Sequence, residues 1–232
     1  MCVLHRRAQP PTWRPTPCQD DPVDRRSTSW LLAALAAVLV FDAVAVDDGL
    51  LAASAHTFAR AHTWVVVTAQ IFAVMGSWVV LVPLTVGVVV LLCRRGHRWW
   101  ALWVALCGMG GWMISESVKH LVDRQRPVWP DPFQELTSPS FPSGHSMAGV
   151  YGYVVFGITA LALLDRRWPG ILLVVFGLLM GPSRVLLGVH WPTDVLGGWL
   201  LAGGWISVCG AVVLRLRGSP PANTPPPAGT PP

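Results

Sequence analysis

Apolar residues are gathered in long runs along this chain, and short polar segments separate the runs. A helix needs about 20 predominantly apolar residues to cross a bilayer, and most of the runs approach that length. Because a helix satisfies its backbone hydrogen bonds internally, the pattern predicts an all-α, polytopic membrane protein with a six-transmembrane-helix bundle. The predicted spans cover residues 30–46, 78–93, 99–118, 147–164, 171–188 and 195–214.

The apolar segment over residues 50–93 is too long for a single crossing. Gly76 and Ser77 interrupt it, and its first half carries several polar side chains. We therefore expect an interfacial or tilted helix over residues 50–74, followed by the span over residues 78–93. The polar side chains of the first half are His56, Arg60, His62 and Gln70.

Both ends of the chain differ in composition from the apolar part. Residues 1–29 are rich in Pro, Arg and Asp without an apolar period, which predicts a disordered tail. Residues 218–232 are a low-complexity Pro/Thr/Gly segment and predict a second disordered tail. Residues 30–217 then form one membrane domain. A cleaved signal peptide is the alternative for the first run, because arginines precede it and Ala43-Val44-Ala45 resembles a cleavage site.

Charge is scarce and unevenly placed in this sequence. Asp, Glu, Lys and Arg make up 12% of the residues, against about 25% in soluble domains. Twelve of the seventeen basic residues fall on one side of the predicted bundle: in the N-terminal tail and at residues 94–98, 166–167 and 215–217. The positive-inside rule makes that side, and with it both tails, cytoplasmic. The arginines form no basic face, so nucleic acid is not an expected partner.

Three polar segments fall on the other, non-cytoplasmic side, although they are far apart in sequence. Residues 119–127 end the third span, residues 142–145 begin the fourth, and residues 183–194 join the fifth to the sixth. Because the direction of the helices alternates, all three segments should meet at one face of the membrane. The linker over residues 128–141, with Trp129 and Phe133, is suited to an interfacial lid over them.

These segments contain the groups that bind phosphate. Lys119, the single lysine, and Arg126 are two helical turns apart and share a face if the helix continues that far. Arg184 adds a third cation, and arginine matches phosphate oxygens with a fork of donors. Ser143 and Gly144 would place backbone N–H groups at a helix N-terminus, which favours an anion.

The same segments contain two histidines and a carboxylate. His190 and Asp194 are four residues apart, and a carboxylate bonded to one imidazole nitrogen leaves the other free to attack phosphorus. His145 could protonate the departing oxygen. Attack by His190 and hydrolysis of a phosphohistidine make a route that needs no metal, although a His-x3-Asp pair could equally ligate one.

Each residue alone has an ordinary explanation. Lysine and arginine near helix ends often extend to lipid headgroups, and Pro142-Ser143-Gly144 alone is a common turn before a helix. The combination of cations, an anion-binding helix start and two histidines at one face favours a catalytic site over these explanations.

Together, the segments resemble the signature of the type-2 phosphatidic acid phosphatase superfamily, in its membrane lipid phosphatase branch. The matching motifs are Lys119-x6-Arg126-Pro127, Pro142-Ser143-Gly144-His145 and Ser183-Arg184-x5-His190-x3-Asp194. All three match without substitution, and the resemblance covers about residues 30–214.

The resemblance implies six transmembrane helices and a phosphohistidine mechanism. It implies that His190 is the nucleophile, Asp194 its orienting partner and His145 the general acid. The residues that it assigns to phosphate binding are Lys119, Arg126, Ser143, Gly144 and Arg184.

We therefore expect a metal-independent lipid phosphate phosphatase without a cofactor, whose partners are the bilayer and a lipid phosphate. The substrate would be a phospholipid or prenyl diphosphate, with phosphatidic acid and undecaprenyl diphosphate the leading candidates. No pattern in the chain specifies an oligomeric state. Two other functions use similar residues: an enzyme like the vanadium-dependent haloperoxidases, and a lipid transporter that recognises a headgroup without chemistry. The haloperoxidases are soluble, and transporters often bind at the membrane midplane, so the interfacial cluster favours the phosphatase.

Overall fold

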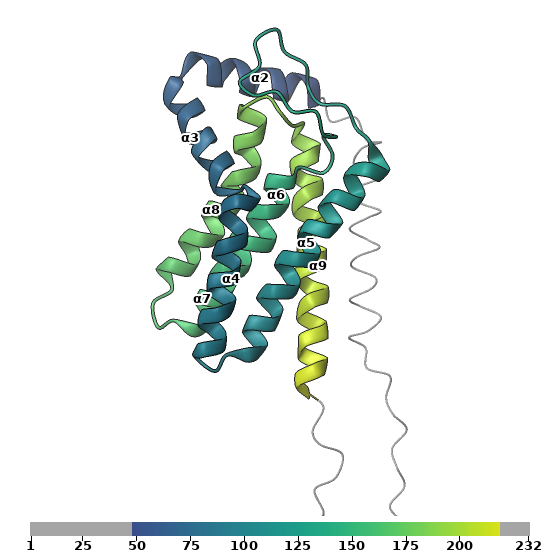
Figure 1. Cartoon of the computed structure of the whole chain (residues 1–232). Helices are drawn as coiled ribbons and strands as arrows, with labels where there is room; N and C mark the ends of the chain where they lie inside the picture. Colours follow the sequence, from purple (N-terminus) through teal and green to yellow (C-terminus); the bar gives the residue numbers. More distant parts are fainter. Residues whose placement is uncertain (1–47, 219–232) are drawn as a thin grey trace, which may run out of the picture.

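The computed structural model describes residues 48–218, and within that range the regular structure is helical (Figure 1). The predicted first span over residues 30–46 and both predicted tails lie outside the described residues, except for residue 218. The helices are α2 (Asp48–Ala61), α3 (Thr63–Met75), α4 (Trp78–Arg94), α5 (Arg98–Val122), α6 (Gly144–Ala148), the π-helical turn η1 (Gly149–Val154), α7 (Val155–Leu163), α8 (Trp168–Leu186) and α9 (Pro192–Gly218).

Four helical segments of the described chain are long and apolar enough to cross a membrane, or five if the bent pair of α2 and α3 is one span. They are α5, the continuous segment Gly144–Leu163, α8 and α9. The apolar helix α4, with 17 residues, falls just short of that length. The chain is therefore an all-helical, multi-pass membrane protein. The expected total of six spans stays a prediction.

The prediction of a single helix over residues 50–74 is wrong. The structure has two helices there, α2 and α3, which meet at 112°. His62 separates them with an extended backbone conformation, and its ring nitrogen Nδ1 lies 2.9 Å from the carbonyl oxygen of Phe58, in the last turn of α2. The polar sequence around His62 ends the first helix, so α2 lies across one end of the bundle while α3 runs down its side (Figure 1).

The segment α6–η1–α7 is the most buried of the candidate spans and packs against α5, α8 and α9. Its approach to α8 is close because glycine faces glycine. A Cβ atom added at Gly149 would lie 2.1 Å from the carbonyl oxygen of Gly177. Any larger side chain at Gly149 would force the two backbones apart, so this contact fixes where the N-terminus of α6 sits.

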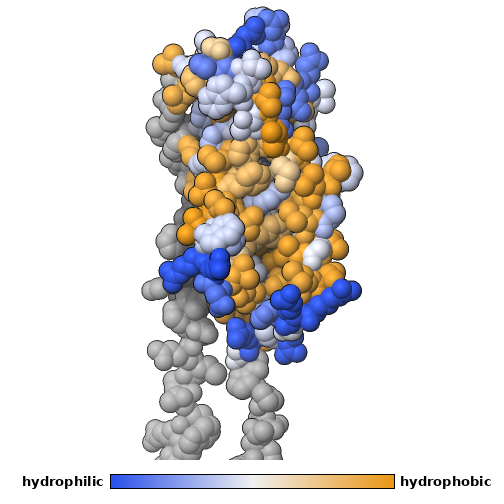
Figure 2. Space-filling model, turned by 90° about the vertical axis from the view of Figure 1, so that its left-hand side faces the viewer, coloured by the Kyte–Doolittle hydropathy of each residue, from blue (hydrophilic) through white to orange (hydrophobic). Residues whose placement is uncertain are grey.

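The outer surface has an apolar belt between two hydrophilic ends, as Figure 2 shows. Large apolar side chains of α4, α5 and α8 are exposed in that belt, including Val82, Trp112 and Leu172. The arginines of residues 94–98, 166–167 and 215–217 lie at one end, at the termini of α4, α5, α7, α8 and α9. The polar segments singled out above lie at the opposite end, covered by α2.

Candidate active site

The site is formed where α5 and α8 end and α6 and α9 begin, so the structure brings together the three predicted segments. The linker over residues 128–141 crosses this end beside α2 (Figure 1). Trp129 of the linker donates an indole N–H to the carbonyl oxygen of Gly188, at 2.7 Å, and its ring stacks on His56 of α2. The linker is thereby fixed over the loop that carries His190.

His190 and Asp194 are in contact, as the spacing predicted. The imidazole Nδ1 lies 3.3 Å from Oδ2 of Asp194, and both side chains are buried. The contact follows from local structure, because α9 begins at Pro192 and holds Asp194 in its first turn, just after the loop that carries His190. The carboxylate accepts a hydrogen bond from the Nδ1–H group, and the Nε2 lone pair is left for another group.

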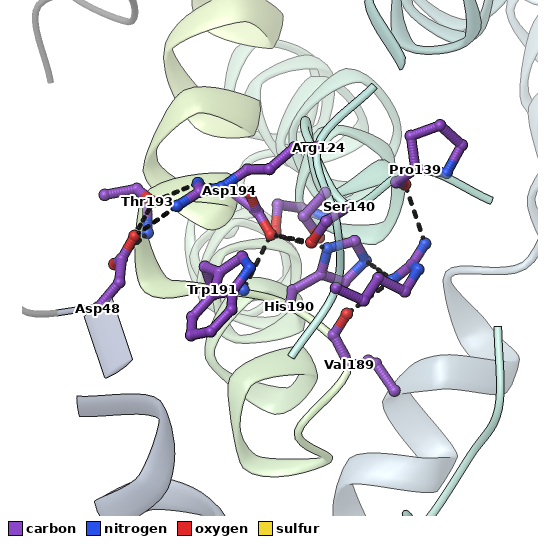
Figure 3. Close-up of polar contacts among 12 residues, drawn as sticks. Asp48, Arg124, Pro139, Ser140, Val189, His190, Trp191, Thr193 and Asp194 are labelled. Carbon is purple, nitrogen blue, oxygen red and sulfur yellow. Dashed lines mark hydrogen bonds and ion pairs between the residues drawn. The ribbon is translucent and has the colours of Figure 1, made fainter. Parts of the chain in front are cut away.

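Asp194 is held by more groups than His190 (Figure 3). Its Oδ1 accepts a hydrogen bond from Nη1 of Arg124 at 2.9 Å. Its Oδ2 accepts from the Ser140 hydroxyl and from the backbone N–H of Trp191, the latter at 2.8 Å. These donors offset the cost of burying a carboxylate and fix the direction in which it faces His190.

Arg126 contacts the other side of the imidazole ring. Its Nη1 lies 3.1 Å from Nε2 of His190 and 2.7 Å from the carbonyl oxygen of Val189. Its Nε and Nη2 donate to Ser138 and Pro139 of the linker. Burial lowers the pKa of Arg126 from its ordinary value, and the charge of Asp194 opposes that shift. The guanidinium is thus fixed beside the atom that would attack a phosphate.

Burial is also the largest influence on His190. It lowers the pKa of His190 from 6.5 to about 4, and the cations Arg126 and Arg184 act in the same direction, whereas Asp194 opposes them. The imidazole is therefore neutral at pH 7, with a proton on Nδ1 and a lone pair on Nε2. This is the protonation state that a nitrogen nucleophile requires.

Arg184 is 1% exposed and only partly satisfied. Its Nη2 donates to Oε1 of Gln134 at 3.1 Å, while Nε and Nη1 have no hydrogen-bond partner among the described residues. Buried N–H groups of a guanidinium almost always have partners. An anion between Arg184 and the neighbouring cations would supply them.

Lys119 approaches the start of α6 from α5. A Cβ atom added at Gly144 would lie 3.4 Å from Nζ of Lys119 and 3.6 Å from Oγ of Ser115. Glycine therefore leaves open the space between the lysine and the helix N-terminus. Lys119 also forms an ion pair with Glu116, one turn earlier on α5, with Nζ 2.9 Å from Oε1. The hydroxyl of Ser115 is buried and lacks a partner in the described part of the chain.

Two details of the predicted anion site are wrong. Helix α5 does not continue to Arg126, because it ends at Val122 and Asp123 has a left-handed backbone conformation, φ 47°. Arg126 thus reaches the site from an extended segment. The backbone N–H of Ser143 donates to the carbonyl oxygen of Asp194, at 3.0 Å, so it is not free for an anion. Ser143 instead caps α6 with its side chain.

His145 lies in α6, with Nε2 2.9 Å from the carbonyl oxygen of Ala73 in α3. A carbonyl oxygen only accepts, so Nε2 carries a proton and Nδ1 is the nitrogen available for proton transfer. Arg184, His190 and Lys119 are all close enough to His145 to act on it electrostatically. The second histidine therefore belongs to the same cluster of charges as the first.

The sequence interpretation missed part of this site. Arg124 lies in the polar segment over residues 119–127, and it bridges Asp194 and Asp48, with Nη2 2.9 Å from Oδ2 of Asp48. Asp48 also accepts from the backbone N–H and the hydroxyl of Thr193. The sequence signal for Arg124 was its position two residues before Arg126. No local pattern marks Asp48 or Ser140.

The surroundings of His190 and Asp194 bear on the alternative that this pair ligates a metal ion. Among residues 48–218, no group of three or more His, Cys, Asp or Glu side chains is placed to hold a metal ion. The pair lies instead against the guanidinium groups of Arg124 and Arg126. A metal cation bound to this pair would meet two fixed positive charges at contact distance, which disfavours ligation there.

A mostly apolar cavity opens beside Lys119 and continues between α4 and α5, with a volume of about 620 Å³. Lys119, Gly144 and His145 line one end. Leu81, Val86 and other apolar side chains of both helices line the rest. The cationic site is thus continuous with an apolar space between α4 and α5.

The fold and this site define an integral membrane protein with a buried, neutral histidine among fixed cations. The sequence model of the PAP2 superfamily matches residues 98–217, which include all three motifs. The chain belongs to the PAP2 superfamily.

Several proteins of known name are similar to this chain. It is 38% identical over 100 residues to an undecaprenyl-diphosphatase of Sulfolobus acidocaldarius, covering 41% of this chain and 46% of that protein. The chain thus spans about half the length of that relative. It is 35% identical to the decaprenylphosphoryl-5-phosphoribose phosphatase of Mycobacterium tuberculosis, covering 61% of this chain and 72% of that protein.

A solved structure extends the similarity to the fold. The crystal structure of a transmembrane PAP2-type phosphatidylglycerolphosphate phosphatase from Bacillus subtilis superimposes with a TM-score of 0.71 at 26% identity. The superposition covers 82% of this chain and 96% of the other. The helical arrangement described above is therefore that of a membrane phosphatase of this superfamily.

Proposed function

We propose that this protein is a membrane lipid phosphatase that hydrolyses the terminal phosphate of a phospholipid or prenyl diphosphate through a phosphohistidine intermediate. The single observation that carries the proposal is the position of His190: neutral, buried, and held between Asp194 on one ring nitrogen and Arg126 on the other. Family membership and the names of the relatives agree with this chemistry.

The phosphate would be bound by Lys119, Arg126, Arg184 and the N-terminus of α6, where Gly144 keeps the space open. Nε and Nη1 of Arg184, which find no acceptor in the described part of the chain, support this assignment, because a phosphate oxygen would be an acceptor for them. Ser143 would contribute through the cap that orders α6 and not through its own N–H, which is engaged with Asp194. The backbone N–H groups of the following residues and the helix dipole would face the anion.

In the first step, Nε2 of His190 attacks phosphorus, and the bond from phosphorus to the lipid oxygen breaks. His145 enters this step as the imidazolium, with its Nε2 proton held by the carbonyl oxygen of Ala73, and donates its Nδ1 proton to the departing oxygen. In the second step, a water molecule gives a proton to His145 and attacks the phosphohistidine, which releases inorganic phosphate and free His190. The fixed cations stabilise the charge on the phosphoryl oxygens in both transition states.

The apolar cavity between α4 and α5 is the basis for proposing a lipid substrate. It begins at the proposed phosphate site, and its apolar lining suits an acyl or prenyl chain. A lipid could therefore place its phosphate beside His190 while its chain stays within the hydrocarbon region. A water-soluble phosphate ester would leave that cavity unfilled.

The proposed orientation follows from the arginines at the end of the bundle opposite the site. By the positive-inside rule that end is cytoplasmic, so the site would lie at the non-cytoplasmic face, with both tails cytoplasmic. The substrate would then be a lipid of the outer leaflet.

Phosphate release by the purified protein in mixed micelles tests the function. Phosphatidic acid and undecaprenyl diphosphate should be hydrolysed in the presence of chelator, with kcat/KM well above that of glucose 6-phosphate. Vanadate should inhibit, because its trigonal-bipyramidal form resembles the transferring phosphoryl group. A soluble ester that matched every lipid would refute the lipid assignment. Movement of lipid across vesicles without phosphate release would identify a transporter, and vanadate-dependent bromination would identify a haloperoxidase.

A further inference from the structure

The junction between the cationic site and the apolar cavity carries two polar side chains that the phosphatase mechanism does not use. Ser115 and Glu116 lie one turn before Lys119 on α5, and both line the cavity. In the described residues, the hydroxyl of Ser115 has no partner. The carboxylate of Glu116 is 42% exposed and reaches Lys119 through Oε1. A substrate atom at this junction would meet a hydroxyl and a carboxylate.

The position of the junction identifies the part of the substrate that would lie there. Lys119 and Gly144 mark the proposed phosphate position, and the apolar lining of α5 continues from Trp112 to Ala105. At 1.5 Å per residue, the helix from Glu116 to Ala105 is about 16 Å long, roughly half the hydrocarbon core. The chain would fill that length. The group that links the chain to the scissile phosphate would therefore lie beside Ser115 and Glu116.

The two side chains differ in their hydrogen bonding. The hydroxyl of Ser115 can donate and accept hydrogen bonds, whereas the carboxylate of Glu116 only accepts them. Glu116 would therefore bind a hydroxyl group on the linking group. The inner phosphate of a diphosphate would instead place negative charge beside the carboxylate. Two adjacent negative charges repel each other, and the repulsion is stronger where apolar side chains exclude water. The positive charge of Lys119 does not cancel this repulsion, because Lys119 would also bind the terminal phosphate.

We propose that Ser115 and Glu116 form a junction subsite that selects the linking group of the lipid. The subsite favours a phosphate monoester whose linking group carries a free hydroxyl, such as a glycerol with one unesterified hydroxyl or a sugar, and disfavours both a fully esterified glycerol and a diphosphate. The inference rests on the proposed lipid phosphatase function and narrows its substrate class. Glu116 acts here as a specificity-determining residue and takes no part in bond breaking.

Three chain-matched substrates test the subsite: 1-O-dodecylglycerol 3-phosphate, dodecyl phosphate and dodecyl diphosphate. The wild-type kcat/KM should decrease in that order. Glu116→Gln removes the charge but keeps the shape, so the ratio of diphosphate to monoester kcat/KM should rise about tenfold, the equivalent of 1.4 kcal/mol. Glu116→Ala should also abolish the advantage of the glycerol compound over dodecyl phosphate, because the acceptor is gone.

Glu135→Gln is the matched control, since Glu135 is an exposed carboxylate of the linker that does not line the apolar cavity. It changes net charge by the same amount and should leave all three ratios unchanged. If Glu116→Gln changed kcat/KM by one common factor for every substrate, Glu116 would only orient Lys119 and the subsite would be refuted. If wild-type protein released phosphate from none of the three, the phosphatase function itself would fail. These two failures are distinguishable because the second does not involve the variants.

Discussion

Arg126 places Nη1 3.1 Å from Nε2 of His190, so a cation occupies the side of the imidazole from which the ring would attack phosphorus. The arrangement assigns the tautomer, because a guanidinium N–H can only donate and Nε2 must therefore be the acceptor. Asp194 fixes the same tautomer from the opposite side of the ring. A phosphate between the two residues would take the Arg126 donor onto one of its oxygens and expose the lone pair to phosphorus.

Removal of the nucleophile should have a larger effect than removal of its orienting partner. His190→Ala should reduce phosphate release to background, because no other described side chain takes its place beside Arg126. Asp194→Asn should leave measurable turnover, since it disturbs the orientation of the ring and not the attacking atom. Rapid acid-free quenching with a ³²P-labelled lipid should trap a base-stable phosphoenzyme in wild type and none in His190→Ala. A phosphoenzyme of undiminished yield in His190→Ala would place the nucleophile elsewhere.

The loss of kcat on replacing His145 should depend on the leaving group of the substrate. His145→Ala should reduce kcat strongly for an alkyl phosphate, whose oxygen leaves as a poor leaving group unless it is protonated. The same variant should be much less impaired with p-nitrophenyl phosphate, whose leaving group needs no proton. The test is the ratio of kcat for the two substrates in wild type and variant. Equal impairment of both would remove His145 from the role of acid.

Arg124 should act on the reaction through Asp194. Arg124→Ala removes a charge-assisted hydrogen bond to Oδ1 of Asp194, and such bonds contribute about 1.5–3 kcal/mol, so kcat should fall roughly 10- to 100-fold. KM should change little, because the residue is not expected to touch substrate, and Arg124→Lys should restore part of kcat. Arg60→Ala is the control and should leave kcat unchanged, since Arg60 is an exposed arginine that pairs with Asp131. A rise in KM with kcat unchanged would make Arg124 a substrate-binding residue instead.

The space beside Gly144 should be required for anion binding. In Gly144→Ala the new methyl group would lie 3.4 Å from Nζ of Lys119, a contact that the fold tolerates but that fills the proposed phosphate position. The inhibition constant for vanadate should rise at least about tenfold, or 1.4 kcal/mol. Gly87→Ala is the matched control, because a Cβ atom there meets nothing within 4 Å. Unchanged vanadate affinity in Gly144→Ala would move the anion away from the N-terminus of α6.

The lowered pKa of His190 should be measurable as a dependence of stability on pH. The folded protein keeps His190 neutral down to about pH 4, whereas the unfolded chain binds a proton below about 6.5. The stability that this difference provides is fully present above pH 6.5 and is lost as the pH falls toward 4, by up to about 3 kcal/mol. Thermal unfolding in detergent at pH 7 and pH 4.5 should show a smaller loss of Tm in His190→Asn than in wild type. An equal loss in both proteins would mean that His190 titrates normally.

Much of the helical architecture could be predicted from hydrophobicity, because the apolar runs after residue 77 that the structure describes each form a helical segment within a few residues of the expected limits. The break at His62 could not be predicted in the same way. Residues 50–61 and 63–74 are both helical and mostly apolar, and only the extended backbone at His62 turns one across the bundle and the other along it. Hydropathy reports composition, whereas the direction of a turn depends on a single residue.

In the candidate site, too, local contacts could be predicted from the sequence and long-range contacts could not. His190 and Asp194 are four residues apart, so their contact follows from local structure. Arg124 and Asp48 are 76 residues apart, and their ion pair depends on where α2 rests against the bundle. The expectation that Lys119 and Arg126 share a helical face failed because the helix ends in a left-handed turn at Asp123. The residues converge as expected, but tertiary packing of the linker brings them together.

Two nitrogens of Arg184, Nε and Nη1, lack partners within residues 48–218, and this has a consequence for handling the protein. A buried donor without a partner costs about 1–3 kcal/mol in the folded state, and an anion at Arg184 would remove that cost. An oxyanion that binds the folded form shifts the unfolding equilibrium by mass action. Purification in sulfate or phosphate should therefore extend the lifetime of the protein in detergent. The same salts would occupy the site in a crystal and lower the measured rate of any assay performed in them.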